Sequence, residues 1–110
     1  MLRESARAFE YDLNMAAVRD PSLPSGVPGG NLLLRLVDAV LTDSESLAAV
    51  QGEIVAELGP EALVDAASVF GNFEMMNRVA DATGIPVSAV AVERERDLIE
   101  ALDIASFLRR

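Results

Sequence analysis

Hydrophobic residues recur along this chain at the spacing of amphipathic helices, and clusters of proline and glycine interrupt the pattern. The first segment, residues 2–19, places its apolar residues on one helical face, at positions i, i+3, i+4 and i+7. Residues 20–30, DPSLPSGVPGG, contain three prolines and three glycines, a density that predicts a loop. Because eleven residues is long for a loop in a compact domain, we expect it to lie over a surface or to reach a neighbouring subunit.

Two shorter helices are predicted next, at residues 31–41 and at about 43–58. Asn31 is a favourable residue for capping the start of the first of these helices. Thr42 and Glu45 have the three-residue separation of a capping box, in which the hydroxyl and the carboxylate each satisfy a backbone amide. The second helix is therefore expected to start within this capping box.

Stop signals define two further helices. Gly59 suits the left-handed position after a helix end, and Pro60 suits the first turn of the helix that follows. The pattern predicts a long central helix at about 60–83, which a Gly-Ile-Pro sequence ends. Ser88 is a suitable cap for a fifth helix at roughly 89–103.

The C-terminal residues Ile104, Phe107 and Leu108 are too apolar to be left in solvent. The segment VSAVAV, residues 87–92, has the β-branched character of a strand, but a single short strand would have no partner, so we assign it to the fifth helix. The prediction for residues 1–110 is therefore a single all-α domain of about five helices.

The long helix at 60–83 is apolar on two sides. An element of this kind is usually central and packed by neighbours on both sides. Gly71 in its middle costs about 1 kcal/mol relative to alanine, which suggests the close approach of another backbone. One apolar stripe comprises Ala62, Ala66, Val69, Phe73, Met76 and Ala80, and the other comprises Val64, Gly71, Met75 and Ala82.

Four polar residues of the same helix lie between these stripes: Glu74, Asn77, Arg78 and Asp81. Glu74 and Arg78 are four residues apart with the acid first, the favoured order for an ion pair. One interpretation is an ion pair on a solvated face, which would contribute little to stability. A second is a structural network that includes Asn77 and Asp81 and is buried at a subunit interface. A third is a catalytic or ligand-binding role for Glu74 and Arg78.

Composition removes several classes of chemistry. The chain has no cysteine and no histidine, which excludes disulfides, thiolate nucleophiles, zinc–thiolate sites and imidazole bases within it. No acidic spacing matches a calcium loop, so no metal and no cofactor is expected. The net charge of −9 opposes binding to nucleic acid or to anionic membranes. No apolar run is long enough to cross a membrane, and no signal peptide is recognisable, so we expect a cytoplasmic protein.

The stretch FGNFEMMNRVADATGIP, residues 70–86, resembles the closing helix of the AhpD-like, or carboxymuconolactone decarboxylase, family. Upstream, ELGPEALVDAASV and LLLRLVDAVLTDSESL resemble two further segments of that family, and DLIEALDIASF resembles a tail found in some members. The resemblance implies an AhpD-like helical domain that assembles into oligomers. The residues that match in the closing helix are Asn72, Phe73, Asn77, Arg78, Ala80, Asp81 and Gly84.

Redox members of that family carry a Cys-x-x-Cys-x-x-x-His motif on an earlier helix. By the resemblance, AFEYDLNMAAVR occupies the corresponding place, so that Phe9, Asp12 and Ala16 replace the two cysteines and the histidine. Thiol peroxidase and disulfide reductase activities need a thiolate, which this chain lacks. The resemblance therefore implies a degenerate member whose vacated site retains only the helical scaffold.

Three functions remain open, and whether the chain is an enzyme is undecided among them. The first is a non-catalytic scaffold, either a homo-oligomer or the partner of a related subunit. The second is a non-redox enzyme of the carboxymuconolactone decarboxylase type, with Glu74 as general acid/base and Arg78 holding a substrate carboxylate. The third is a module that binds a small molecule in a pocket near Phe9, Asp12 and Phe73.

Overall fold

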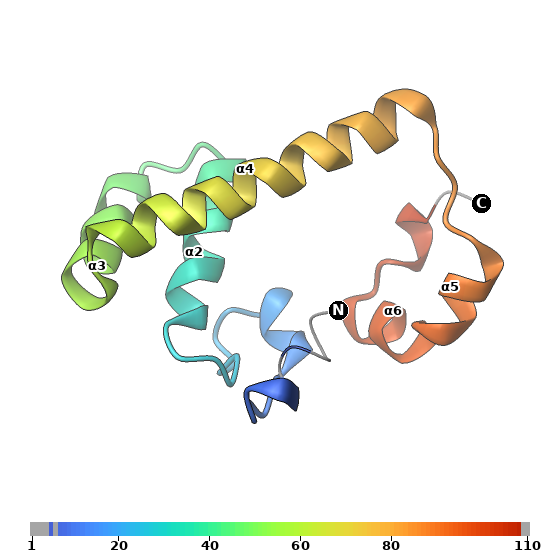
Figure 1. Cartoon of the computed structure of the whole chain (residues 1–110), viewed down its shortest axis with the longest axis horizontal. Coiled ribbons are helices and arrows are strands. Elements are labelled where there is room, and N and C mark those ends of the chain that lie inside the picture. Colours follow the sequence, from blue (N-terminus) through green and yellow to red (C-terminus); the bar gives the residue numbers. More distant parts are fainter. Residues whose placement is uncertain (1–4, 6, 109–110) are drawn as a thin grey trace. The chain divides into compact units, whose positions relative to one another are not determined.

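The computed structural model describes residue 5 and residues 7–108, and every regular element among them is a helix (Figure 1). The fold of this part of the chain is all-α, as the hydrophobic pattern predicts. Two short 3₁₀ helices stand near the ends of the described chain, with five α-helices between them. The elements are η1 (Met15–Val18), α2 (Gly30–Leu41), α3 (Leu47–Leu58), α4 (Pro60–Thr83), α5 (Ala89–Arg94), α6 (Arg96–Leu102) and η2 (Ala105–Phe107).

The chain divides into two units, residues 1–70 and residues 71–110, and the boundary falls within α4. Each unit is compact by its own internal contacts. The expectation of one domain over the whole chain stays a prediction.

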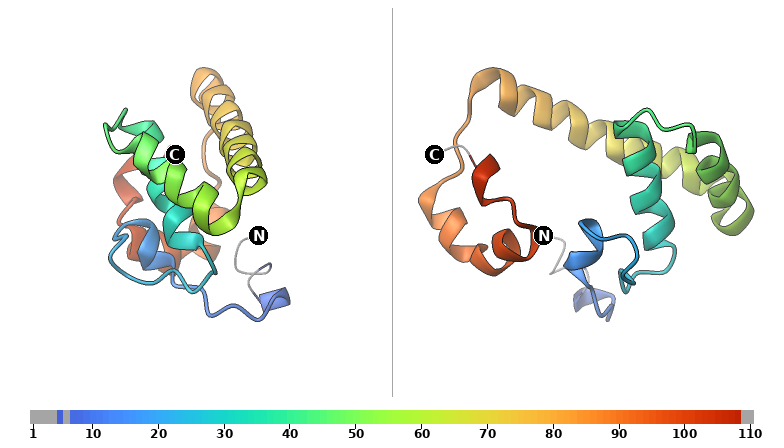
Figure 2. Two further views of the ribbon diagram at one scale, coloured as in Figure 1. Left: turned by 90° about the vertical axis from the view of Figure 1, so that its left-hand side faces the viewer. Right: turned by 180° about the vertical axis from the view of Figure 1, so that it is seen from behind.

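The core of the first unit lies between α2 and α3, which run side by side in both views of Figure 2. Leu32 and Leu36 are four residues apart on α2, and Val50 and Ile54 are four apart on α3. This spacing puts each pair on one helical face, and the two faces bury each other. The partly buried residues that pack against this core are Leu33, Leu47, Leu63 and Ala66.

The predicted helix at 2–19 is formed only in part: residues 5, 7 and 8 are helical, but the helix does not continue beyond them. Residues 11–14 have no helical structure, and only the short 3₁₀ helix η1 follows them. Two features interrupt the helix: Glu10 has a left-handed backbone (φ 57°), and the Asn14 side chain accepts a hydrogen bond from the Ala16 amide at 3.1 Å. Residues 2–4 and 6 of the predicted helix lie outside the described residues.

Asn31 does not cap α2, because Gly29 occupies the N-cap position and the helix starts at Gly30. The Asn31 side chain instead holds the preceding loop at 20–30. Its amide nitrogen donates to the carbonyl oxygens of Pro21 (3.2 Å) and Leu23 (2.7 Å), and its oxygen accepts from the amide of Ser25 (2.9 Å). The loop is thus secured by one side chain within the first unit.

The capping box at Thr42 and Glu45 is also wrong. The Thr42 hydroxyl donates to the Asp38 carbonyl oxygen at 2.7 Å, so this residue closes the end of α2 rather than opening α3. Helix α3 begins later than expected, after Ser46, whose side chain makes no capping bond. The error arises because a threonine between two helices has two possible partners. Its hydroxyl can donate to a carbonyl oxygen of the helix before it or accept from an amide of the helix after it.

The long helix α4 covers the predicted range, from Pro60 to Thr83. Gly59 precedes the helix with φ 94°, and Gly84 follows it with φ 68°. Positive φ values of this kind favour glycine. Figures 1 and 2 show α4 as one uninterrupted helix.

The fifth predicted helix, at 89–103, is two helices. The Ser88 hydroxyl caps α5 as predicted, accepting from the Ala91 amide at 3.2 Å. Glu95 then leaves the helical conformation (φ −104°, ψ 20°) and separates α5 from α6. The tail that follows contains η2, in which Phe107 is exposed, although Ile104 and Leu108 are half-buried.

Candidate functional site on helix α4

Helix α4 is 24 residues long, and none of its residues is buried. Residues of its first turns rest on the core of the first unit, where Leu63 and Ala66 pack against α2 and α3. Further along the helix the same side carries the polar residues Glu74, Asn77 and Asp81. The helix thus leaves six large apolar side chains exposed, which are Val64, Val69, Phe73, Met75, Met76 and Val79.

The first exposed surface, here called the phenylalanine face, comprises Val69, Phe73, Met76 and Ala80. It continues the apolar stripe that begins at Ala62 and Ala66. Phe73 and Met76 are both 54% exposed. The prediction that α4 is apolar on two sides holds, but among the described residues no member of either stripe is buried.

The second surface, here called the glycine face, comprises Val64, Gly71, Met75 and Ala82. Met75 is 60% exposed, slightly more than Met76 on the other face. A Cβ atom placed on Gly71 would meet nothing within 4 Å outside the helix's own backbone. The close backbone approach expected at Gly71 is therefore absent within the described part of this chain.

Glu74 and Arg78 form an ion pair of 3.5 Å between Oε2 and a guanidinium nitrogen. The Arg78 side chain is 76% exposed and that of Glu74 is 30% exposed, which matches a pair on a solvated helix face. Such pairs contribute little because water screens them. Asn77 and Asp81 are exposed as well, so the structure shows no buried network at these residues.

Phe9, Asp12 and Ala16, the positions predicted to replace the redox motif, do not share a helix. Phe9 and Asp12 precede η1, and only Ala16 lies within it. Phe9 is 70% exposed and stacks on Tyr11, with the ring centroids 6.1 Å apart. This exposed pair is not the lining of a closed site, and a small-molecule pocket that includes Phe73 stays a prediction.

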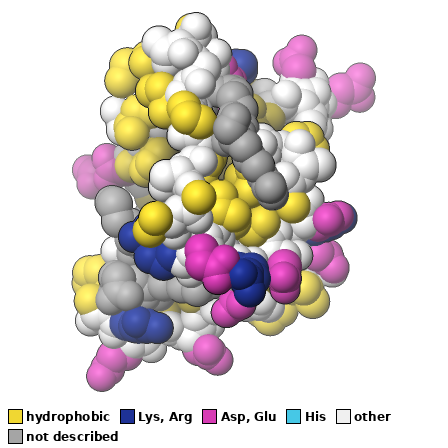
Figure 3. All heavy atoms as spheres, turned by 90° about the vertical axis from the view of Figure 1, so that its right-hand side faces the viewer, with side chains coloured by type: hydrophobic (Ala, Val, Ile, Leu, Met, Phe, Trp, Pro, Cys, Tyr) yellow, Lys and Arg dark blue, Asp and Glu magenta, His cyan; other side chains and the backbone are white. Residues whose placement is uncertain are grey.

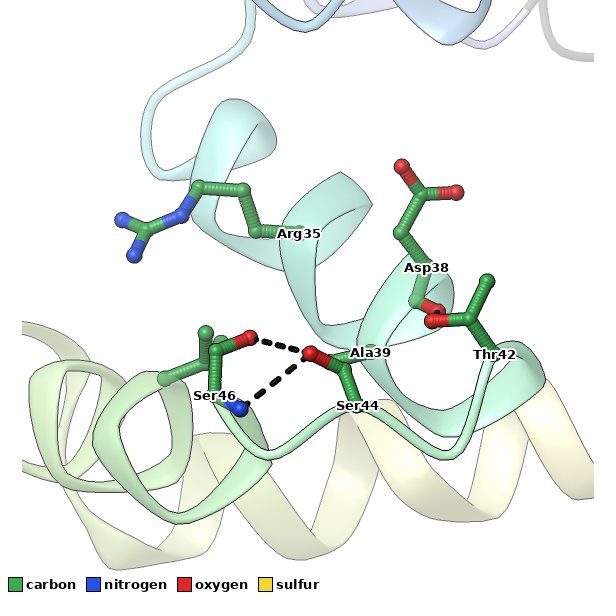
Figure 4. A pocket seen from close by; sticks show the side chains of 7 residues that line it. Arg35, Asp38, Ala39, Thr42, Ser44 and Ser46 are labelled. Atoms are coloured by element: carbon green, nitrogen blue, oxygen red, sulfur yellow. Dashed lines mark hydrogen bonds between the residues drawn. The ribbon is translucent and has the colours of Figure 1, made fainter.

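An open hollow of about 270 Å³ lies where α2 turns into α3. Figure 4 shows two of its serines bonded to each other: the Ser44 and Ser46 hydroxyl oxygens are 2.8 Å apart, and the Ser46 amide donates to Ser44 Oγ at 3.1 Å. The residues that line the hollow are Arg35, Asp38, Ala39, Thr42, Ser44, Ser46 and Val50.

Arg35, at the edge of this hollow, is engaged elsewhere. Its guanidinium donates two hydrogen bonds to the Glu53 carboxylate on α3, at 2.7 and 2.8 Å. These bonds lower the pKa of Glu53 and raise that of Arg35. Sequence reasoning missed this pair, because residues 18 apart have no signature in local spacing. Because Arg35 is paired with Glu53 and the Asp38 carboxylate also lines the hollow, the hollow is poorly suited to binding an anion.

The second unit, like α4, has no buried residue among those described. Among residues 71–108 no side chain is buried. Figure 3 faces this part of the molecule and shows hydrophobic side chains on the surface beside acidic and basic ones. The charged residues at 93–97 are largely exposed. The two arginines among them pair with neighbouring acids: Arg94 with Glu95, and Arg96 with Glu93.

No group of three or more acidic side chains in the described residues is arranged to hold a metal ion. No helix in the same part of the chain is long and apolar enough to cross a membrane. Comparison with protein families, with curated protein sequences and with solved structures finds no match to this chain. The resemblance to the AhpD-like family therefore stays a prediction.

Proposed function

We propose that this chain is a non-catalytic, cytoplasmic scaffold subunit of the AhpD-like type, which associates with copies of itself or with a related subunit. The observation that carries the proposal is the absence of any buried residue among positions 71–108, although this region includes half of the longest helix. Large uncovered apolar surfaces on a protein typically mark sites of association.

The exposed apolar side chains of α4 represent a large transfer free energy. The six exposed apolar side chains of α4 leave on the order of 600 Å² of apolar surface in water, at about 100 Å² each. At about 25 cal/mol per Å², removing this surface from water is worth about 15 kcal/mol before the entropic cost of association is subtracted. That is comparable to the whole stability of an ordinary domain, which is about 5–15 kcal/mol.

The chemistry of the chain supports a non-catalytic role. With no cysteine and no histidine, it has neither a thiolate nor an imidazole base. Its one candidate acid–base pair, Glu74 with Arg78, has an exposed guanidinium, and a solvated pair is poorly suited to acid–base catalysis. The features that remain are surfaces rather than a reactive centre.

The experiment that tests the proposal is the native mass of the protein recovered under gentle conditions from its own cells. We expect a whole multiple of 11.7 kDa, or a complex with a related subunit. A mass of 11.7 kDa at every concentration would contradict the proposal. Recovery with a related subunit would support a heteromeric scaffold.

A further inference from the structure

We propose that Met75 and Met76 of α4 are an oxidation site for hydrogen peroxide, at which the two thioethers become sulfoxides, Met75 first. Both residues belong to the second unit, residues 71–110. The inference goes beyond the proposed function, because it concerns a reaction of the chain's own side chains rather than its association with another chain.

Methionine is the only sulfur-containing residue type in this chain, which has four methionines and no cysteine. Met1 lies outside the described residues, and Met15, at the start of η1, is half-buried. Met75 is 60% exposed and Met76 is 54% exposed. Because a dissolved oxidant reaches a side chain through solvent, oxidation of the described methionines is expected to concentrate at the adjacent pair on α4.

The two sulfur atoms of this pair differ in their hydrogen bonding. The Asn72 side-chain amide, one turn earlier on α4, donates to Met76 Sδ at 3.9 Å. Within the described residues, Met75 Sδ accepts no hydrogen bond. A thioether is a weak acceptor, and donation to it draws electron density from the lone pairs that attack an oxidant. Met75 is therefore expected to be oxidised before Met76.

The charge of the chain favours an uncharged oxidant. The net charge of −9 produces a negative field that repels anions from the surface. Hydrogen peroxide is neutral at physiological pH, so it approaches the pair without the repulsion that an anionic oxidant meets.

The reaction is a two-electron oxygen transfer. A lone pair of the methionine sulfur attacks one peroxide oxygen, so that an S–O bond forms as the O–O bond breaks. The departing hydroxide takes the proton from the transferred oxygen and leaves as water; sulfur is oxidised and peroxide is reduced. The reverse step needs a thiol reductant, and since this chain has no cysteine, a separate sulfoxide reductase must supply it.

Oxidation changes the surface of α4, because a sulfoxide is polar where a thioether is apolar. Met75 belongs to the glycine face and Met76 to the phenylalanine face, since neighbouring residues lie about 100° apart around a helix. Oxidation of both residues therefore makes each of the two exposed faces more polar.

The test treats the intact chain with hydrogen peroxide for timed intervals, at several protein concentrations, and locates each added oxygen by tandem mass spectrometry of its peptides. We expect Met75 to react first, and both Met75 and Met76 to react at least about threefold faster than Met15. The same treatment in denaturant is the control for the folded structure, and there the three rates should converge.

A second set of variants tests the hydrogen bond from Asn72. Asn72→Ala removes the donor and should raise the oxidation rate of Met76 about two- to fivefold, with the rate of Met75 as the internal control. Asn72→Leu also removes the donor but keeps the bulk of the side chain, and it should give the same increase. Asn77→Ala changes another exposed asparagine of α4 and should alter neither rate. Circular dichroism checks that each variant is as helical as the parent chain.

The outcomes separate the site from the hydrogen bond. Fast oxidation at Met75 and then Met76, with slow oxidation at Met15, supports the site. Folded-state rates that are equal at all three, or lower at Met75 and Met76 at every protein concentration, would overturn it. Oxidation of Met76 before Met75, or an increase with Asn72→Ala that Asn72→Leu does not reproduce, would overturn the role of the hydrogen bond. The native mass, which tests the scaffold proposal, is measured independently of all these rates.

Discussion

The α2–α3 pair and the region at 71–108 are built from similar helical sequence, yet they differ completely in burial. In the first, apolar residues four positions apart face each other across two helices, and Ile54 is fully buried. In the second, no residue between 71 and 108 is buried. The comparison shows that an apolar stripe makes a core only when a second stripe lies opposite it, which amphipathic periodicity alone does not supply.

The two regions also differ in how their helices are defined. Both helices of the α2–α3 pair are held by tertiary packing, which provides most of the stability of short helices. Helix α4 is defined largely by local signals at its ends, with Gly59 and Pro60 before it and Gly84 after it. The second half of α4 therefore has a clear secondary structure without a matching core, as expected for a surface that another chain covers.

The largest effect is expected at the centre of the α2–α3 core. Ile54→Ala should lower the free energy of unfolding by about 2–5 kcal/mol, because it leaves a cavity beside Val50. Val55→Ala, at the exposed next position, should change it by less than about 0.5 kcal/mol. Denaturant unfolding of both variants measures the difference, and equal losses would show that α3 is not packed as described.

The next effect is expected where the first unit holds its loop. Asn31→Ala removes three hydrogen bonds to loop backbone groups and should cost about 1–3 kcal/mol. The control is Gln51→Ala, an exposed polar position on α3. Amide exchange at Ser25, whose N–H donates to Asn31, should accelerate in the first variant alone. Unchanged exchange at Ser25 would refute the role given to Asn31.

A smaller effect is expected at two open glycines, one in each region. A methyl group added at Gly52 on α3 or at Gly71 on α4 would meet no atom within 4 Å outside the helix's own backbone. Alanine at either should stabilise its helix by up to about 1 kcal/mol, since glycine is a poor helix former. Thermal unfolding should show the same gain in stability for both variants. Native mass should show no change in assembly for either. A loss at Gly71 alone would indicate that another backbone packs on the glycine face.

The smallest effect concerns the ion pair between Arg35 and Glu53. Because the pKa of Glu53 is lowered in the folded chain, the pair contributes stability above the ordinary carboxyl pKa of about 4.5, and loses it as pH falls through the lowered value. The stability difference between the parent chain and Glu53→Gln should therefore be small near neutral pH and vanish in acid. Both side chains are partly exposed, so the effect is modest. A difference that grows on acidification would contradict this assignment.

The sequence predicts the fold best where local signals act alone. The all-α class, the extent of α4 and the cap at Ser88 follow from glycine, proline and serine at helix ends. The errors arise where a side chain has two available partners. Asn31 bonds to the loop instead of capping α2, and Thr42 closes α2 instead of opening α3.

The candidate site was predictable only in part. The two apolar stripes and the pair of Glu74 with Arg78 are visible in helical spacing, and the structure places them on α4 as expected. Whether a stripe is covered depends on contacts between distant residues, which spacing does not reveal. The same limit hid the bond between Arg35 and Glu53, because it joins two helices.

The most direct test of the account is amide hydrogen exchange measured well above and well below the dissociation constant of the assembly. The account predicts that amides at 71–83, in the second half of α4, become more protected as the protein associates. Amides of the core residues in α2 and α3 should be equally protected at both concentrations. Protection at 71–83 that is strong and independent of concentration would show that the chain covers α4 by itself, and would contradict the central claim.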